Sequence, residues 1–501
     1  MLSKGTASTG TAATATCCDF ILFGTLGDLA RRKLLPALYQ LEKANLLHAK
    51  TRIIGVARDS IDTETFTAKV QASLEEFVGK AQLDNAVWER LAKRLAYCGF
   101  DLASVSEYSL LAKTLKRDDN RAVLSYLATP PQLFPSICKG LSEHQLVTEN
   151  ARVVLEKPLG HDLPSSRDIN QEVGNYFAES QIYRIDHYLG KETVLNLLAL
   201  RFANPIFADQ WTHNAIDHVQ ITAAEQVGVE GRWSYYDDAG QLRDMVQNHL
   251  LQVLALIAME PPTRLDAESV REEKIKVLRS LRPITQQNVR EDTVRGQYSG
   301  GFVGDKKVPG YLEEEGANAS SKTETFVALK AHIDNWRWSQ VPFYLRTGKR
   351  MAQKRTEIVI TFKPQPHNIF HETMAQLPPN RLVIRLQPDE GVEIQMMNKV
   401  PGLGKQMQLK PTTLDLSFDE TFENQRISDA YERLLLEAIE GNQYLFVARD
   451  EVEFAWKWID GIREAWQQTN EEPKPYPSGS LGPAAAITLI AHDGREWDDD
   501  F

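Results

Sequence analysis

The sequence has few cysteines, no long apolar run and fewer basic than acidic residues. Four cysteines in 501 residues, none of them in a C-x-x-C pair, are typical of a protein from a reducing compartment. No stretch approaches the roughly 20 apolar residues of a membrane-spanning helix, so we expect no membrane partner. The formal net charge of -11 argues against nucleic acid as a partner, because phosphate binding needs a basic surface. A small anionic substrate is still allowed, since it needs only a local pocket of positive charge.

The first 16 residues, MLSKGTASTGTAATAT, lack the features of a targeting segment. A transit peptide would be richer in arginine, and a secretory signal would contain an apolar core. We therefore expect a disordered tail over residues 1–17 and a cytoplasmic protein. A chain of 501 residues also exceeds what one ordinary hydrophobic core supports, so we expect at least two domains after the tail.

The first third of the chain alternates short apolar runs with helical patterns, which is typical of βαβ units around a parallel sheet. The expected strands there are 19–23, 52–57, 121–128 and 152–155, and a helix with a kink at Pro36 is expected over 28–45. Beyond about residue 190 we expect a long helix at 241–257, antiparallel strands at 326–333, 357–362 and 381–386, and helices at 429–440 and 451–468. The pattern predicts an α/β Rossmann domain over 18–187, followed by an α+β domain over 188–501.

A glycine-rich turn follows the first expected strand, and its residues are Gly24, Thr25, Leu26, Gly27, Asp28 and Leu29, with Ala30 after them. The glycines allow a tight turn and the close approach of a pyrophosphate, and the helix N-terminus that follows attracts the anion. The position of the turn favours a dinucleotide site over a purely structural turn, although G-x-x-G turns are common. For Asp28, at the start of the helix, capping alone is a sufficient role.

Three later positions are expected at the same edge, because ligands gather where parallel strands end. Arg58 follows the second strand, where an arginine can hold the 2′-phosphate of NADP and an acidic residue would favour NAD. Tyr126 lies in the run YLATPP, and Lys157 lies in EKP, where a cis X–Pro bond would fix the direction of the lysine. We expect Lys157 to reach both cofactor and substrate. A solvated arginine and a plain surface lysine are the alternatives.

The run RIDHYLGKE at 184–192 is the most informative in the chain. If it opens a helix, His187 and Lys191 lie four residues apart on one face, where two cationic donors can grip a phosphate. Asp186 lies outside that face and can meet a different partner. A solvated, charged helix face is the alternative.

A histidine occupies an apolar helical face in the run LRDMVQNHLLQ at 242–252. His249 shares one stripe with Leu242, Val246 and Val253, so we expect a buried imidazole. Such a residue is either a hydrogen-bonded core histidine or a general base that works near neutral pH, and the spacing does not decide between them.

A cationic cluster near residue 350 comprises Arg346, Lys349, Arg350, Lys354 and Arg355. It is either a second phosphate or sugar contact or a solvated face. Two histidines, at 367 and 371, have the spacing of metal ligands but lack the H-E-x-x-H context, so we expect no metal site.

Five runs together resemble the glucose-6-phosphate dehydrogenase family, in the order in which the family has them. They are GTLGDLA at 24–30, EKPLG at 156–160, RIDHYLGKE at 184–192, RDMVQNHLLQ at 243–252 and RTGK at 346–349. The nonapeptide RIDHYLGKE is highly specific to the family, and the resemblance extends from about residue 18 to near the C-terminus. It implies a Rossmann domain joined to an α+β domain with a large, mainly antiparallel sheet. It also implies a homodimer or a dimer of dimers built through the second domain.

The resemblance further implies an activity and a set of site residues. The activity is oxidation of the C1 hydroxyl of glucose 6-phosphate to the 6-phospholactone with hydride transfer to NADP, the first step of the oxidative pentose phosphate pathway. His249 is similar to the family's general base, and Asp186 is similar to the carboxylate that pairs with it. The substrate-binding positions are His187 and Lys191 for the phosphate, with Glu225, Asp244, Lys349, Lys354 and Lys157. The cofactor-binding positions are those of the glycine turn with Arg58, Asp101, Tyr126 and Lys157. Because Thr25 or Leu26 helps to set the cofactor preference, some use of NAD is also allowed.

Two other functions account for parts of the pattern. A Rossmann oxidoreductase of the inositol-dehydrogenase type also has an E-K-P strand end, but its unphosphorylated substrates leave His187 and Lys191 unexplained. A catalytically silent NADP sensor would be expected to lack the base or its carboxylate, whereas His249 and Asp186 are both present. Turnover of unphosphorylated polyols would favour the first alternative, and NADP binding without turnover would favour the second.

Overall fold

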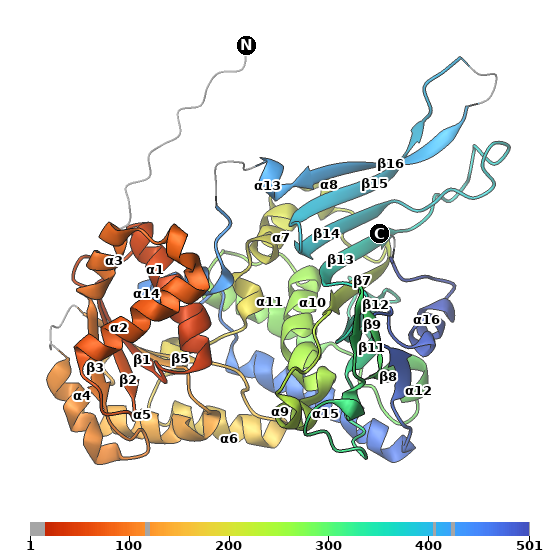
Figure 1. Ribbon diagram of the computed structural model, residues 1–501. Helices are drawn as coiled ribbons and strands as arrows, with labels where there is room; N and C mark the ends of the chain where they lie inside the picture. The colour runs from red at the N-terminus through yellow and green to blue at the C-terminus, as the bar shows by residue number, and fades with distance from the viewer. Residues whose placement is uncertain (1–15, 116–120, 404–406, 422–425, 500–501) are drawn as a thin grey trace, which may run out of the picture. The chain divides into compact units, whose positions relative to one another are not determined.

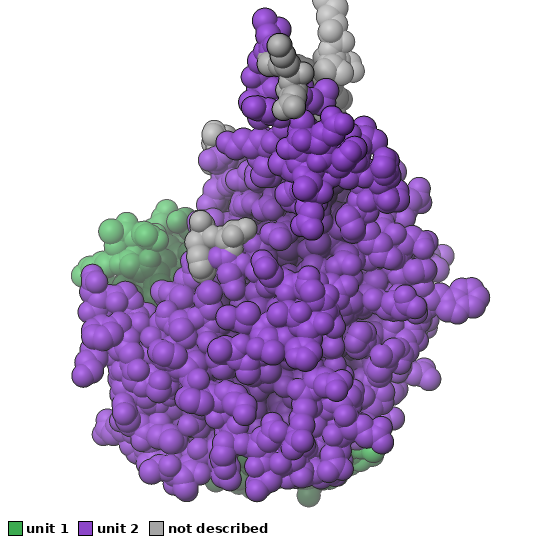
Figure 2. All heavy atoms as spheres, turned by 90° about the vertical axis from the view of Figure 1, so that its right-hand side faces the viewer, with its two compact units in different colours: residues 1–160, 164–190, 428–449 green, residues 161–163, 191–427, 450–501 purple. Residues whose placement is uncertain are grey.

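The chain forms two compact units, which are coloured separately in Figure 2. The computed structural model describes residues 16–115, 121–403, 407–421 and 426–499. The first unit combines 1–160, 164–190 and 428–449, and the second combines 161–163, 191–427 and 450–501. The expected tail over 1–17 lies almost wholly outside the described residues, since the first strand already begins at Cys18.

The first unit is built on a six-stranded sheet in the order β3-β2-β1-β4-β5-β6, with every neighbouring pair parallel (Figure 1). Its strands are β1 (Cys18–Phe23), β2 (Arg52–Ala57), β3 (Leu95–Gly99), β4 (Ala122–Leu127), β5 (Ala151–Leu155) and β6 (Ile182–Arg184). The four strands expected from the sequence are confirmed to within a residue at each end. This order, with the chain reversing direction across the sheet between β1 and β4, is that of a Rossmann domain.

Helices connect these strands, as the pattern predicts. The expected helix at 28–45 is observed as a π-helical segment, η1 (Ala30–Leu34), followed by α1 (Leu35–Lys43). The irregular turn immediately precedes Pro36, the residue that cannot donate a backbone hydrogen bond. The other helices of the unit are α2 (Thr63–Leu74), α3 (Asn85–Ala92), α4 (Tyr108–Thr114), α5 (Phe134–Glu143), most of α6 (Leu163–Gly174) and α14 (Ala430–Glu440).

Helix α14 belongs to the first compact unit, although it lies far along the chain from the rest of that unit. The sequence predicts this helix, but places it in the second domain. Its buried residues Leu434, Leu435 and Ile439 belong to the first unit, and Arg152 on β5 donates hydrogen bonds to the carbonyl oxygens of Ala438 (2.8 Å) and Ile439. The strand residue therefore satisfies carbonyl groups that the end of a helix leaves without partners.

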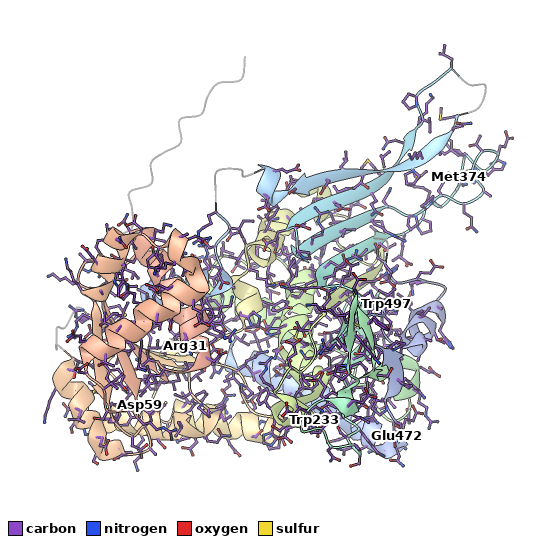
Figure 3. The ribbon with its side chains drawn as sticks, in the orientation of Figure 1. Arg31, Asp59, Trp233, Met374, Glu472 and Trp497 are labelled. Carbon is purple, nitrogen blue, oxygen red and sulfur yellow. The ribbon has the colours of Figure 1, made fainter. Side chains whose placement is uncertain are left out.

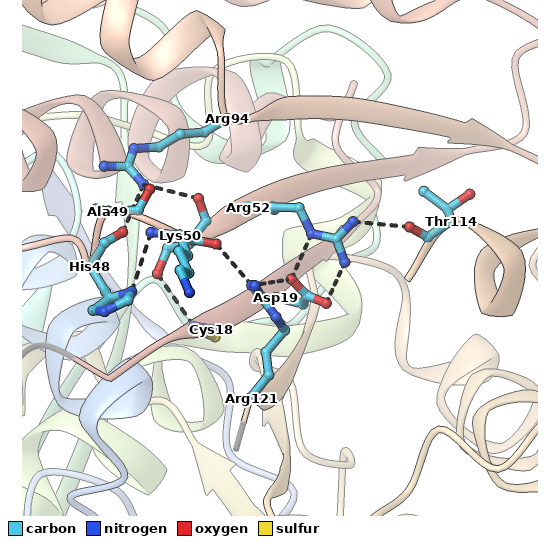
Figure 4. A network of polar contacts seen from close by, with 10 residues as sticks. Cys18, Asp19, His48, Ala49, Lys50, Arg52, Arg94, Thr114 and Arg121 are labelled. Atoms are coloured by element: carbon cyan, nitrogen blue, oxygen red, sulfur yellow. Dashed lines mark hydrogen bonds and ion pairs between the residues drawn. The ribbon is translucent and has the colours of Figure 1, made fainter. Parts of the chain in front are cut away.

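A buried ion-pair network lies at the amino edge of the parallel sheet (Figure 4). Asp19 on β1 is fully buried and accepts hydrogen bonds from Arg52 on β2 (2.9 and 2.6 Å) and from Arg121 (2.9 Å). Removing one partner of a buried ion pair is strongly destabilising, so this network stabilises the pairing of adjacent strands. It lies at the end of the strands opposite to the edge where cofactor residues are expected.

The second unit contains a nine-stranded sheet in the order β16-β15-β14-β13-β7-β12-β11-β8-β17. The pairs β7–β12 and β8–β17 are parallel and the others are antiparallel, so the predicted mainly antiparallel sheet is confirmed. The strands are β7 (Ile216–Ala224), β8 (Thr293–Ser299), β11 (Phe326–His332), β12 (Pro342–Gly348), β13 (Arg355–Phe362), β14 (Arg381–Gln387), β15 (Gly391–Lys399), β16 (Leu409–Ser417) and β17 (Lys474–Pro477).

The helices of the second unit include α7 (Glu192–Phe202), α9 (Trp233–Gln241), η8 (Leu242–Leu250), α10 (Leu251–Ala258), α11 (Ala267–Arg279), α15 (Arg449–Thr469) and α16 (Ala484–Ala491). The helix expected at 241–257 is therefore present, but its first half, η8, is π-helical. A buried cluster contains Trp233 and Trp497 (Figure 3), whose indole N–H groups donate to the carbonyl oxygens of Tyr311 (3.0 Å) and Ala486 (2.8 Å). Among the described residues, no helix combines the length and apolar character needed to span a bilayer.

Candidate active site

The glycine turn is tight, and its backbone packs closely against the ends of the neighbouring strands. Gly24 has φ +76°, and a Cβ added there would lie 2.2 Å from the carbonyl oxygen of Ala128. Its N–H donates to the carbonyl oxygen of Val56 (2.9 Å), and the N–H of Gly27 donates back to the carbonyl oxygen of Gly24 (2.9 Å). Only glycine combines this backbone conformation with this packing. The predicted tight turn between β1 and the following helix is confirmed.

Two hydroxyl groups beside this turn indicate that a polar ligand fits there. The side-chain oxygens of Thr25, after β1, and Thr129, after β4, are buried and have no hydrogen-bond partner within the described chain. Buried polar groups are nearly always hydrogen-bonded, so these two need a partner that the protein does not supply. A dinucleotide phosphate or ribose can supply it. Asp28 forms an exposed ion pair with Arg32 (2.5 Å), and Leu26 and Leu29 are partly buried.

The other expected cofactor residues lie at the same carboxyl edge of the sheet. Arg58 follows β2 and is exposed, and Asp101 lies just beyond β3, where its carboxylate accepts a hydrogen bond from the N–H of Ala103 (3.1 Å). Lys157 follows β5 and is partly buried, and its peptide bond to Pro158 is cis. Tyr126 differs from the others because its side chain is fully buried within the unit.

A buried carboxylate next to Lys157 was not expected from the sequence. Glu156 accepts a hydrogen bond of 2.5 Å from the hydroxyl of Tyr126. Burial raises the pKa of Glu156, although Tyr126 and Lys157 oppose the rise. Tyr431, on α14, also donates to this carboxylate and is stacked on the ring of His187, with centroids 6.3 Å apart. Glu156 and Tyr431 therefore connect the end of β5, beside Lys157, with His187, a residue that is predicted to bind the phosphate. Only the adjacency of Glu156 to Lys157 in EKP could have indicated this role.

The predicted helical face carrying His187 and Lys191 is wrong. Residues His187–Gly190 form a short 3-10 turn, η7, and Lys191 has extended backbone angles as the residue before α7. The two side chains are therefore not one α-helical turn apart on a common face, because Gly190 and Lys191 interrupt the helix. Lys191 donates from Nζ to Gln387 on β14 (2.7 Å). Asp186 is buried in the first unit and accepts a hydrogen bond from the N–H of Tyr188 (2.9 Å).

The predicted burial of His249 is confirmed. His249 is 1 % exposed, and the other residues of its stripe, Leu242, Val246 and Val253, are buried as well. The histidine lies on η8, a π-helical segment, and π-helical turns are rare but occur frequently at functional sites. Asp244 is partly buried in the same segment. One helix of the second unit thus carries both an imidazole and a carboxylate that the sequence predicts as site residues.

Two further predicted substrate residues form an ion pair. Lys349, which follows β12, is 5 % exposed and donates from Nζ to the carboxylate of Glu225 (2.8 Å). The ammonium also lies 5.2 Å from the centre of the Tyr236 ring, within the range of a cation–π contact. Glu225 follows β7, whose pairing with β12 is parallel, so the two residues leave the sheet side by side. Lys354 is exposed in the turn that follows.

The arginines near Lys349 have internal partners instead. Arg346 is buried, pairs with Asp499 (2.6 Å) and lies 4.4 Å from the ring centre of Trp497. Arg355 pairs with Glu357 (2.5 Å). For this cluster the sequence allows a phosphate or sugar contact or a solvated face, and the structure adds ion pairs for these two arginines. They neutralise carboxylates inside the second unit.

Comparisons with known proteins agree over nearly the whole chain. The family model "Glucose-6-phosphate dehydrogenase, NAD binding domain" matches residues 21–196, and "Glucose-6-phosphate dehydrogenase, C-terminal domain" matches residues 198–498. The glucose-6-phosphate 1-dehydrogenase of Dickeya dadantii is 58% identical over 97% of this chain and 99% of its own length. That of Rhizobium meliloti is 51% identical over 96% and 97%. A solved glucose-6-phosphate dehydrogenase in complex with its substrate glucose 6-phosphate is 36% identical, with a TM-score of 0.89 over 98% of this chain and 100% of the other.

Proposed function

The chain belongs to the glucose-6-phosphate dehydrogenase family, and from this premise we propose the chemistry of its individual residues. It is an oxidoreductase that acts on glucose 6-phosphate with a nicotinamide cofactor. The observation that carries the proposal is the buried imidazole of His249 on η8, in the same unit as the Lys349–Glu225 pair. We propose NADP as the preferred cofactor and the 6-phospholactone as the product.

His249 is the proposed general base. The buried imidazole accepts the proton of the C1 hydroxyl, and the Asp186 carboxylate orients the ring and stabilises its protonated form, as an aspartate does in a catalytic triad. A general base of this kind contributes roughly 10²–10⁴ to the rate. The bound nicotinamide supplies the hydride acceptor, and the chain's residues supply binding, orientation and proton transfer.

The remaining predicted residues hold the sugar phosphate. His187 and Lys191 are proposed to bind the phosphate. Glu225 and Asp244 are proposed to bind sugar hydroxyls, and Lys349, Lys354 and Lys157 are proposed to contact the substrate. Anchoring the phosphate aligns C1 with the cofactor, so binding energy at the far end of the sugar serves the reaction.

Cofactor preference rests on the residue after β2. An exposed guanidinium at Arg58 suits the 2′-phosphate of NADP, and it occupies the position where an acidic residue would favour NAD. The turn residues Gly24 to Leu29, with Asp101 and Lys157, are proposed to hold the rest of the dinucleotide, and the unsatisfied hydroxyl of Thr25 supports this. We also propose a cytoplasmic homodimer or dimer of dimers, in accord with the low cysteine content and the family resemblance.

The substitution His249→Asn tests the proposal. We expect the wild-type chain to reduce NADP with glucose 6-phosphate, to be slower with NAD, and to be inactive on free glucose. The variant should retain its melting temperature and its affinity for glucose 6-phosphate but lose roughly 10²–10⁴ in kcat, because the base acts in the transition state. Absorbance of the reduced nicotinamide measures all of these rates. A variant with wild-type kcat would disprove the role of His249, and a folded wild-type chain without turnover would disprove the activity.

A further inference from the structure

A buried glutamine lies where the three segments with predicted sugar-binding residues meet. Gln241 is 0 % exposed and immediately precedes η8, the segment that carries Asp244 and His249. Its neighbour Gly240 has φ +71° and ψ 164°, which breaks the chain direction between α9 and η8. The beginning of η8 is therefore set by contacts at Gln241 rather than by continuation of the preceding helix.

The backbone of this junction is held by Glu324. The N–H of Gln241 donates to the carbonyl oxygen of Glu324 (2.9 Å), and the N–H of Leu242 donates to its side-chain Oε1 (3.0 Å). A carboxylate that accepts from the first N–H groups of a helix is favourable, because those groups lack partners within the helix. A Cβ at Gly240 would lie 2.5 Å from the same Oε1, so this arrangement also requires glycine there.

The side chain of Gln241 connects the junction with the large sheet. Its Nε2 donates to the hydroxyl oxygen of Thr347 on β12 (2.7 Å), which in turn donates to the carbonyl oxygen of Ala223 on β7 (2.7 Å). Its Oε1 accepts from the hydroxyl of Tyr236 on α9 (2.6 Å). The amide can satisfy both partners in only one orientation, since one partner needs its nitrogen and the other its oxygen.

Each branch of this network ends beside a predicted substrate residue. Thr347 on β12 precedes Lys349 by two positions, and Ala223 on β7 precedes Glu225 by two positions, and both charged residues directly follow their strands. The ring of Tyr236 lies 5.2 Å below the ammonium of Lys349. Burial and the nearby carboxylates of Asp244, Glu324 and Glu225 raise the pKa of Tyr236 well above its usual range, so its hydroxyl remains a donor.

We propose that Gln241 is a positioning residue, whose amide fixes the helix bearing Asp244 and His249 against the strand ends bearing Lys349 and Glu225. The inference rests on the proposed function of those four residues. A purely structural core position would be filled as well by an apolar side chain of the same length, whereas a fully satisfied buried amide specifies one arrangement of its neighbours.

The substitution Gln241→Met tests this, because methionine preserves the unbranched shape and removes both hydrogen bonds. We expect kcat/KM for glucose 6-phosphate to fall about 10- to 100-fold, with the KM for NADP within about twofold of wild type. The matched control is Leu254→Ala, at a fully buried position of α10 without a polar contact to the network. That variant should lower the melting temperature and leave both KM values unchanged when it is assayed well below its melting temperature.

A second variant covers the case in which Gln241→Met does not fold. Tyr236→Phe keeps the ring beside Lys349 and removes only the hydroxyl that donates a hydrogen bond to Gln241. We expect the KM for glucose 6-phosphate to rise about 3- to 10-fold in this variant. Wild-type kinetics for glucose 6-phosphate in every variant that folds, whether or not its melting temperature falls, would overturn the positioning role. An inactive wild-type chain would instead overturn the proposed function, so the two failures are distinguishable.

Discussion

The acid Glu357 shows how one buried side chain determines a pH dependence. Burial raises the pKa of Glu357 from its ordinary value of 4.5 to about 7, and Arg355, at 2.5 Å, only partly opposes this rise. Between pH 4.5 and about 7, the Glu357 side chain is therefore protonated in the native state and ionised in the unfolded state. The stabilisation is fully present below about pH 4.5 and is lost as the pH rises through about 7, which over this interval amounts to about 3 kcal/mol.

The substitution Glu357→Gln should remove this contribution, because the amide does not titrate. We expect the melting temperature of the wild-type chain to fall more steeply between pH 5 and 8 than that of the variant, at constant ionic strength. Glu268→Gln, at an exposed site in the first turn of α11, is the control and should follow the wild type. Parallel melting curves for wild type and Glu357→Gln across this range would contradict the assignment.

Individual site residues differ in how far the sequence reveals them. His249 could be predicted as buried because its apolar stripe is local, and Gly24 could be predicted because a strand and a helix flank it. Gln241 and Tyr431 could not, since their importance depends on side chains that come from distant parts of the chain. The helical face expected for His187 was wrong for a related reason, as four-residue spacing has meaning only if the helix is continuous.

At the level of elements, the turn after β1 makes a prediction about glycine. Gly24→Ala would combine a positive φ with a Cβ only 2.2 Å from a carbonyl oxygen of the backbone. Gly79 is the matched control, because its φ is +97° but nothing lies within 4 Å of an added Cβ. We expect Gly79→Ala to cost about 1–2 kcal/mol of unfolding free energy and Gly24→Ala to cost about 3 kcal/mol or more, with weaker NADP binding only in the latter.

Urea unfolding and titration of cofactor binding measure both effects. Equal unfolding midpoints for the two variants would show that backbone strain alone determines the cost, and would remove the argument from close packing.

In the parallel sheet, the strands that the sequence missed are the short ones. Strands β3 and β6 have five and three residues, too few for an apolar run to stand out, whereas β1, β2, β4 and β5 are longer or more uniformly apolar. The long helix around His249 was expected, but its π-helical half was not, since the hydrogen-bond register of a helix leaves little trace in an apolar stripe. Periodicity thus predicts that a helix or strand is present more reliably than it predicts the internal geometry of that element.

At the level of the whole molecule, both sheet types were predictable and the division of the chain was not. Continuous apolar runs indicate a sheet covered on both faces, and alternation indicates one covered on a single face. No local pattern reveals that residues 428–449 return to the first unit after more than two hundred residues of the second. That return depends on contacts such as those of Arg152 with the end of α14, which are far apart in the sequence.

The return of α14 predicts which fragments fold. A fragment of residues 18–187, the domain expected from the sequence, lacks Leu434, Leu435 and Ile439, each fully buried in the intact first unit. Losing three such side chains removes about 4.5–9 kcal/mol of stabilisation from apolar burial, which is comparable with the whole stability of a domain. We expect this fragment to unfold without a cooperative transition.

Joining residues 16–190 to 428–449 through a glycine–serine linker should restore a cooperative transition and NADP binding, because the linked helix covers the same apolar surface. Circular dichroism melting and cofactor titration of the two fragments decide the matter, and cooperative unfolding of 18–187 with the midpoint of the linked fragment would show that α14 is dispensable to the first unit.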